Sequence, residues 1–191
     1  MAIPRPRALV ATGLNVTLRL VIVGVVLDAL RHPDAARYAG KAIGTRGLVL
    51  IPASLLVPLL HLVRRRRGRY PAWTDNLYLS VFALDMSGNL LDLYDRYFFF
   101  DLVPHFHGTG AVSVALSQLF RLPVLAGIGV AQIIHVLLEA QEYYSDVLFG
   151  LRNVRGTWDT INDLLAGIGG SLAYGGLLAI ARRRGWVSPQ N

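Results

Sequence analysis

The chain lacks cysteine, contains a single lysine and has few charged residues for its length. The absence of cysteine excludes a disulfide-stapled secreted scaffold. Only 16% of its 191 residues are charged, whereas soluble globular domains carry about 25%. Disorder is excluded as well, because 53% of the residues are hydrophobic. The missing charge therefore argues against a soluble domain and favours an integral membrane protein.

Apolar residues and arginine are abundant instead. The mean hydropathy is +0.45, and 19 basic residues against 12 acidic ones give a net charge of +7. A basic excess can indicate nucleic-acid binding, but that reading needs a solvated surface. In a chain this hydrophobic, arginine marks the cytoplasmic ends of membrane helices. We therefore expect the lipid bilayer as the partner and no nucleic acid, and the strong preference for arginine is typical of a GC-rich bacterial genome.

Six stretches are long and apolar enough to be read as spans, because a helix needs about 20 mostly apolar residues to cross a bilayer. The apolar runs are long and lack the alternating pattern of a barrel. The predicted fold class is all-α: a polytopic transmembrane helix bundle of about six spans, forming one integral-membrane domain over 1–191. The predicted spans are 8–30, 42–63, 76–94, 103–120, 123–144 and 161–181, of which the fourth is the least distinct.

Counts of basic residues on the two sides of the predicted bundle set its orientation. With six spans both termini lie on one side, together with the loops after the second and fourth spans. That side holds eleven basic residues and the other six, so the positive-inside rule places both termini in the cytoplasm of a bacterial inner membrane. The eleven are Arg5, Arg7, Arg64, Arg65, Arg66, Arg67, Arg69, Arg121, Arg182, Arg183 and Arg184; the six are Arg31, Arg37, Lys41, Arg96, Arg152 and Arg155.

The first predicted span contains a charged residue, Arg19. Basic residues ahead of an apolar stretch are typical of a signal peptide, but Arg19 interrupts the stretch and no small-residue cleavage pattern follows before Asp28. We expect a retained span in which Arg19 faces the bundle and pairs with a carboxylate. Small residues at 127, 131, 167, 170, 171 and 175 predict close helix packing.

Acidic and histidine side chains form polar stripes on four of the predicted helices. Residues three, four, seven and eleven apart share a helix face, and all four stripes fall in the half of the bundle that the charge count places outside. The stripes are His135, Glu139, Glu142 and Asp146 on the fifth span; Asp85, Asn89, Asp92 and Arg96 on the third; Asp101 and His105 on the fourth; and Asp159 and Asp163 on the sixth.

Convergence of these stripes predicts a functional site, because charged groups inside a bilayer are costly unless they are paired, hydrated or functional. Inward-facing carboxylates and imidazoles can ligate a divalent metal, and a carboxyl pair can act as acid and base. A solvated vestibule or an ion-paired packing network is the structural alternative. The catalytic candidates are Glu139, Glu142, His105, Asp159 and Asp163; the metal-ligand candidates are these five and His135; the lining candidates are Asp85, Asn89, Asp92, Asp101 and Asp146.

Three separated motifs stand in the order Asp-x-x-x-His-Phe, Glu-x-x-Glu and Trp-Asp-Thr-x-x-Asp, at 101–106, 139–142 and 158–163. This ordered set resembles the signature of the YjdF-like family of uncharacterised bacterial inner-membrane proteins and is similar to the broader VanZ-like group. The resemblance covers roughly residues 75–180. It implies a multi-helix membrane protein whose shared polar residues form a site, without a settled reaction. The chain departs from the pattern at His107 and in the compact segment 147–157, so no role transfers there.

Three functions are compatible with these features. The first is an enzyme or enzyme-like accessory protein that acts on a lipid or lipid-linked cell-envelope substrate in the outer leaflet. The second is a small transporter or proton-coupled permease, which would use the intramembrane acids as a relay. The third is a non-catalytic scaffold or assembly protein in which the polar cluster locks helix packing.

Overall fold

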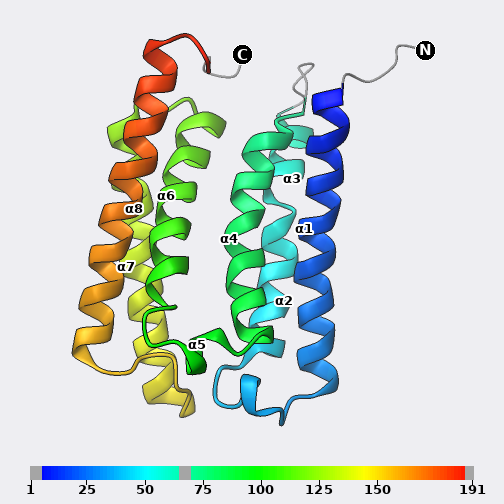
Figure 1. The fold of residues 1–191 in the computed structure, drawn as a ribbon, viewed down its shortest axis with the longest axis vertical. Helices are drawn as coiled ribbons and strands as arrows, with labels where there is room; N and C mark the ends of the chain where they lie inside the picture. Colours follow the sequence, from blue (N-terminus) through cyan, green and yellow to red (C-terminus); the bar gives the residue numbers. More distant parts are fainter. Residues whose placement is uncertain (1–5, 65–69, 188–191) are drawn as a thin grey trace.

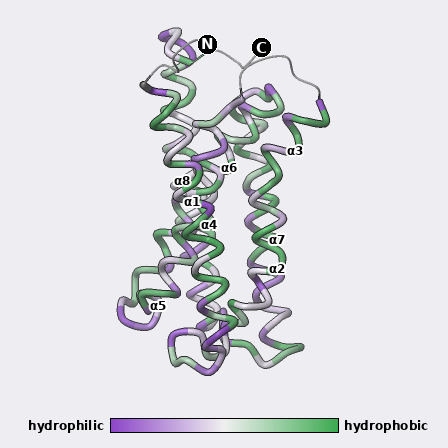
Figure 2. Tube along the Cα trace, turned by 90° about the vertical axis from the view of Figure 1, so that its right-hand side faces the viewer, coloured by the Kyte–Doolittle hydropathy of each residue, from purple (hydrophilic) through white to green (hydrophobic). Residues whose placement is uncertain are grey.

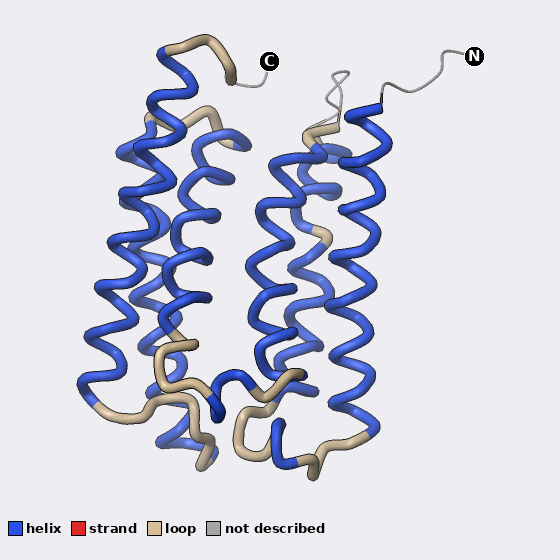
Figure 3. The backbone as a smooth tube through the Cα atoms, in the orientation of Figure 1, coloured by secondary structure: helices blue, strands red, loops and turns tan. Residues whose placement is uncertain are grey.

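A computed structural model describes residues 6–64 and 70–187, and these residues are helical, with no strand among them. Figure 1 shows the helices and Figure 3 shows the loops that join them. A short 3-10 helix covers Ala36–Tyr38. The α-helices are α1 (Pro6–Arg31), α2 (Ile43–Ser54), α3 (Leu56–Val63), α4 (Ala72–Leu90), α5 (Leu93–Arg96), α6 (Leu102–Leu119), α7 (Val124–Phe149) and α8 (Thr157–Arg183).

The long helices form two groups that run side by side (Figure 1). One group contains α1, the pair α2 and α3, and α4; the other contains α6, α7 and α8. The most extensive helix contacts are between α6 and α8 and between α1 and α4, while α4 packs on α6 and joins the groups. Successive passes alternate in direction, so α1 begins and α8 ends at the same end of the bundle. We call the opposite end, where α5 lies, the α5 end.

Apolar and polar side chains are distributed in the opposite way to a soluble protein. Leu125, Val63 and Leu62 are 78%, 78% and 69% exposed, whereas Asp75 and Ser171 are fully buried. Hydrophobic residues follow the helices along most of their length (Figure 2). Four segments are long and apolar enough to cross a membrane: Arg7–Arg31, Ile43–Val63, Val124–Phe149 and Thr157–Arg183. An apolar exterior around a polar interior is the arrangement that a bilayer favours, so the chain is a helical membrane protein.

The helix bounds differ from the predicted spans by more than two residues, or by a break, in four of the six spans. One of the four is the last span, 161–181, because α8 already begins at Thr157. The span 76–94 is wrong at both ends, because α4 begins at Ala72 and ends at Leu90. The chain reverses at Asp92, whose φ of 59° is left-handed, so Tyr94 belongs to the separate helix α5. The span 42–63 is broken at Leu55 into α2 and α3, and the span 123–144 continues as α7 to Phe149.

The number of spans and the orientation stay predictions. Helices α4 and α6 run alongside the four apolar segments in the bundle but are not among them. Five of the basic residues that fix the orientation, Arg5, Arg65, Arg66, Arg67 and Arg69, lie outside the described residues. Arg7 lies at the end of the bundle where α1 begins.

The prediction that Arg19 pairs with a carboxylate is confirmed. Arg19 Nη2 lies 2.7 Å from Asp75 Oδ2, which also accepts hydrogen bonds from Asn15 and Tyr70. Arg19 Nη1 donates to the carbonyl of Ser54, at the break between α2 and α3. That carbonyl lacks its usual helical donor because the residue four positions on is Pro58, which has no N–H. Arg19 therefore ties α1 to α4 and caps the end of α2.

Small residues allow the close packing of α6, α7 and α8, as their spacing predicts. A Cβ on Gly170 would lie 1.8 Å from the carbonyl oxygen of Phe106, so α8 touches the backbone of α6 there. A Cβ on Gly127 would lie 2.0 Å from Ser117 Oγ. These contacts explain why α6 is buried along most of its length, and they fix the helices that carry the polar stripes relative to one another.

Candidate functional site

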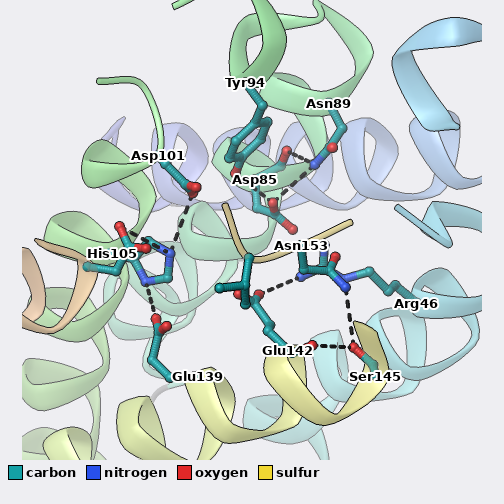
Figure 4. Close-up of polar contacts among 12 residues, drawn as sticks. Arg46, Asp85, Asn89, Tyr94, Asp101, His105, Glu139, Glu142, Ser145 and Asn153 are labelled. Atoms are coloured by element: carbon teal, nitrogen blue, oxygen red, sulfur yellow. Dashed lines mark hydrogen bonds and ion pairs between the residues drawn. The ribbon is translucent and has the colours of Figure 1, made fainter. Parts of the chain in front are cut away.

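His105 is the centre of a polar cluster between α6, α7 and α8. It lies one turn into α6 and is 9% exposed. Its Nε2 atom is 3.5 Å from Asp101 Oδ1 on the preceding turn and 3.9 Å from Asp163 Oδ1 on α8. Its Nδ1 atom is 3.3 Å from Glu139 Oε1 on α7. Figure 4 shows the imidazole ring between the carboxylates of Asp101 and Glu139.

A second histidine completes the cluster. His135 Nε2 lies 2.8 Å from His105 Nδ1 and 3.3 Å from Glu139 Oε1, one turn along α7. The close approach of two ring nitrogens requires one hydrogen between them, so one ring donates and the other accepts. Two sets of possible ligand atoms result, each within 4.8 Å: His105, His135 and Glu139, and Asp101, His105 and Asp163.

Several polar atoms of this cluster are buried without a hydrogen-bond partner in the described part of the chain. They are His135 Nδ1, Glu139 Oε1 and Asp163 Oδ1, on side chains of residues that are 4%, 5% and 4% exposed. Glu139 Oε1 is 3.3 Å from both ring nitrogens but in hydrogen-bond geometry with neither. A buried polar atom without a partner costs free energy, so the cluster has unused capacity to bind something.

Arg46 is a residue of the site that the sequence reasoning missed. It lies on α2, and its Nη2 atom is 3.2 Å from Glu142 Oε1 on α7, which links the two helix groups. Asp85 and Asp101 are close enough to act on it electrostatically. The available signal was an arginine inside the apolar stretch 42–63, the same signal that identified Arg19 in the first span.

Asp85 belongs to a smaller network at the α5 end. Its Oδ1 atom accepts hydrogen bonds from Asn89 Nδ2 at 3.1 Å and from the Tyr94 hydroxyl at 2.7 Å. Burial and the negative charge of Asp85 raise the pKa of the Tyr94 hydroxyl well above its usual value, so Tyr94 stays a donor. Asp85 and Asn89, two predicted lining residues, therefore lie together beside Arg46.

Three of the predicted site carboxylates bind groups that lie close to them in the sequence. Asp146 accepts hydrogen bonds from the backbone N–H groups of Asn153 and Val154, both at 2.8 Å. Asp159 accepts from the N–H of Arg155 at 2.8 Å. Asp92 pairs with Arg96 at 3.3 Å on the surface. The structure brings together His105, His135, Glu139, Asp101 and Asp163, whereas Glu142 and Asp159 fall in neither set of possible ligand atoms among the described residues.

His107 faces the other side of α6, as its position on the helix predicts. Its Nε2 atom lies 2.8 Å from Ser80 Oγ on α4, and its Nδ1 atom lies 2.8 Å from the Tyr174 hydroxyl on α8. It lines an open cleft of about 760 Å³ between α4, α6 and α8. The other lining residues are Ser80, Leu84, Leu102, Val103, Phe106, Ala166 and Tyr174, most of which are apolar.

The arrangement can hold a cation or move protons. Five carboxylates interact electrostatically through the cluster, and Arg46 is close to part of it, so negative charge is in excess. The five are Asp85, Asp101, Glu139, Glu142 and Asp163. No family model matches the sequence, and no curated protein or solved structure is significantly similar to it.

Proposed function

We propose that the protein is a membrane-embedded enzyme that acts on a lipid or lipid-linked cell-envelope substrate in the outer half of the bilayer. The observation that carries this proposal is the position of His105, buried between the carboxylates of Asp101, Glu139 and Asp163 on three packed helices. Its outer location rests on the predicted orientation, in which the α5 end faces away from the cytoplasm.

The proposed chemistry is acid and base catalysis around His105. An imidazole with carboxylates near both ring nitrogens can take up a proton on one side while the other side is held by a carboxylate. Glu139 would act as the base toward the substrate, since one of its oxygens has no hydrogen-bond partner within the described residues. Asp101 and Asp163 would orient the ring through Nε2.

The open cleft beside α6 supports a lipid substrate, and we assign the hydrocarbon chain of that lipid as its occupant. The cleft is mostly apolar, and two of its lining residues, Val103 and Phe106, are 48% and 40% exposed, so an acyl chain could reach them from the bilayer. Leu102, also in its lining, follows Asp101, whose carboxylate contacts His105. A chain in the cleft would therefore hold its polar head near the proposed catalytic group.

The test compares lipid turnover by the wild type and by Glu139→Gln. The purified protein in nanodiscs is incubated with a total bacterial lipid extract, and lipid classes are quantified by mass spectrometry. We expect the wild type to consume one class and Glu139→Gln to lose that activity by about 100-fold or more, as for other acid–base residues. Asp146→Asn is the matched control on the same helix, because Asp146 is held by a loop. Equal lipid profiles for the wild type and Glu139→Gln would sink the proposal.

A small transporter is the second candidate, and one observation favours it. The first helix of one group, α1, runs in the opposite direction to the first helix of the other group, α6, and the later helices of each group alternate from there. Each group has a buried polar cluster, around Asp75 in one and around His105 in the other. Two helix groups of inverted topology, with polar sites among their helices, are typical of secondary transporters. Proteoliposomes loaded with a pH-sensitive dye test this function. A proton flux that Asp75→Asn and Glu139→Gln both abolish would favour it over the enzyme.

A further inference from the structure

We propose that His105 Nδ1, His135 Nε2 and Glu139 Oε1 bind one zinc ion. This inference deepens the proposed function, on which it rests for the role of the ion, because it names the cofactor of the same site. Where zinc is bound, Glu139 Oε1 would be a ligand of the ion in place of a base toward the substrate. The two claims differ in what they require: the first needs turnover of a lipid, the second needs only equilibrium binding of a metal.

The distances between the three atoms fit a shared tetrahedral ion. Zinc bonds of about 2.0–2.1 Å to nitrogen and oxygen place tetrahedral ligands about 3.3–3.4 Å apart. Glu139 Oε1 is 3.3 Å from His105 Nδ1 and 3.3 Å from His135 Nε2. The two nitrogens are 2.8 Å apart, so they would open by about 0.5 Å around the ion. Histidine rings on separate helices can make that adjustment by rotation.

The unmet bonding capacity of the same atoms points to a ligand. Glu139 is only 5% exposed, and its Oε1 atom has no hydrogen-bond partner within the described residues. The same atom lies close to two ring nitrogens. The nitrogens have only one hydrogen to share between them. A cation at the centre of the three atoms would satisfy all three lone pairs together, which hydrogen bonding in this geometry does not.

Asp101 and Asp163 fit the role of outer partners of the ligands. A histidine that binds a metal through one nitrogen donates its other N–H to a carboxylate or carbonyl in most sites. His105 Nε2 lies 3.5 Å from Asp101 and 3.9 Å from Asp163, on the side of the ring away from Glu139. Because neutral imidazole has one lone pair, binding through Nδ1 makes Nε2 a donor. The two sets of ligand atoms therefore describe one ion and its supporting carboxylates.

Charge balance also favours a divalent cation. Glu139, Asp101 and Asp163 act electrostatically on His105, and Glu142 is close to both His105 and Glu139. Arg46 offsets part of this negative charge through Glu142. Carboxylates among membrane helices are costly unless they are compensated, and zinc would supply two positive charges at the point where the side chains meet.

The ligand set is one that zinc uses, and it indicates a reactive site. Two histidines and one glutamate are a known zinc set that leaves the fourth tetrahedral position for water or substrate. Structural zinc sites instead close all four positions with protein ligands.

The experiment measures zinc binding by the full chain in detergent. The protein is stripped with a chelator and dialysed against buffered Zn²⁺, and bound metal is counted by mass spectrometry; Co²⁺ replaces Zn²⁺ to give the absorption bands of tetrahedral coordination. We expect one ion per chain and at least about tenfold weaker binding by Glu139→Gln and His135→Gln. His107→Gln is the matched control, since His107 lies on α6 but faces Ser80 and Tyr174.

A substoichiometric zinc content in the wild type overturns the inference, whatever the variants do. So does equal affinity in the wild type and in folded Glu139→Gln. If a variant does not fold, the wild-type stoichiometry and the Co²⁺ spectrum still decide the question. Zinc binding without lipid turnover would refute the proposed function alone, and lipid turnover by a wild type that binds no zinc would refute the zinc site alone.

Discussion

Gly167 gives the sharpest test of how α8 shapes the histidine cluster. A Cβ at this position would lie 2.2 Å from His135 Nδ1 and 2.9 Å from Thr109 Oγ1. Ordinary contacts of a Cβ begin at 3.4 Å, so Gly167→Ala must displace the His135 ring or separate the helices by about 1 Å. The substitution adds one methyl group and changes no charge, which isolates the effect of position.

The expected effect on zinc is large because metal sites tolerate little displacement. Ligand distances must hold within about 0.2 Å, so a ring shifted by about 1 Å leaves the coordination sphere. We expect Gly167→Ala to bind zinc at least about tenfold more weakly. The same crowding should lower the free energy of unfolding by about 1–3 kcal/mol. Zinc at 100 times its dissociation constant should stabilise the wild type by about 2.7 kcal/mol, and the variant should lose most of this gain.

Gly176→Ala, on the same helix, is the matched control. No described atom lies within 4 Å of a Cβ built there, so this change should leave zinc binding as in the wild type. Thermal unfolding in detergent with and without zinc, together with zinc titration, measures both effects. Wild-type zinc affinity in Gly167→Ala, with Gly176→Ala also unchanged, would show that His135 is not a ligand in this geometry.

Three further predictions concern the charged groups. Arg46→Gln should tighten zinc binding a few-fold in the same titration, because a cation near Glu142 is removed; weaker binding would contradict the charge argument. Asp75→Asn should lower the free energy of unfolding by about 3–5 kcal/mol in mixed micelles, since the partly buried Arg19 loses the fully buried carboxylate that pairs with it; a change below about 1 kcal/mol would contradict this role. A hydrogen bond from Lys41 lowers the pKa of Asp95 below its usual 3.8, so this half-exposed pair stabilises the fold above about pH 4 and the contribution is lost as the pH falls through the lowered pKa. Asp95→Asn should therefore cost less than about 1 kcal/mol at pH 7 and nothing near pH 2, and an equal loss at both values would exclude the ion pair as its cause.

Periodicity predicted which face of a helix each polar residue occupies. It did not predict which side chains of other helices and loops lie beside that face at each level. His135 and Glu139 are one turn apart and meet His105, as their spacing suggests. Glu142 and Asp146 share that face, yet they lie about 10 and 16 Å further along α7 from His135 at 1.5 Å per residue. At those depths their neighbours are Arg46 and the loop at Asn153, so they have other partners.

A contact between helices was predictable where a charged side chain inside a span required a partner of opposite charge. Arg19 needed a carboxylate, and Asp75 on α4 supplies it. The cap that Arg19 provides for the Ser54 carbonyl was not predictable, because it depends on how α1 crosses the break between α2 and α3. Arg46 carries the same signal as Arg19, because it is the one charged residue inside the apolar stretch 42–63, but its partner Glu142 lies 96 positions away and cannot be chosen from spacing.

The polar character of α6 has a consequence for how the protein is made. This helix is not among the four that are long and apolar enough to cross a membrane, and its most extensive contacts are with α8, which follows it in the chain. A helix that depends on a later partner cannot reach its final position before that partner has been synthesised. His105 and its neighbours therefore assemble only after α8 has been synthesised, and a nascent chain cut before Thr157 would leave them without the helix that encloses them.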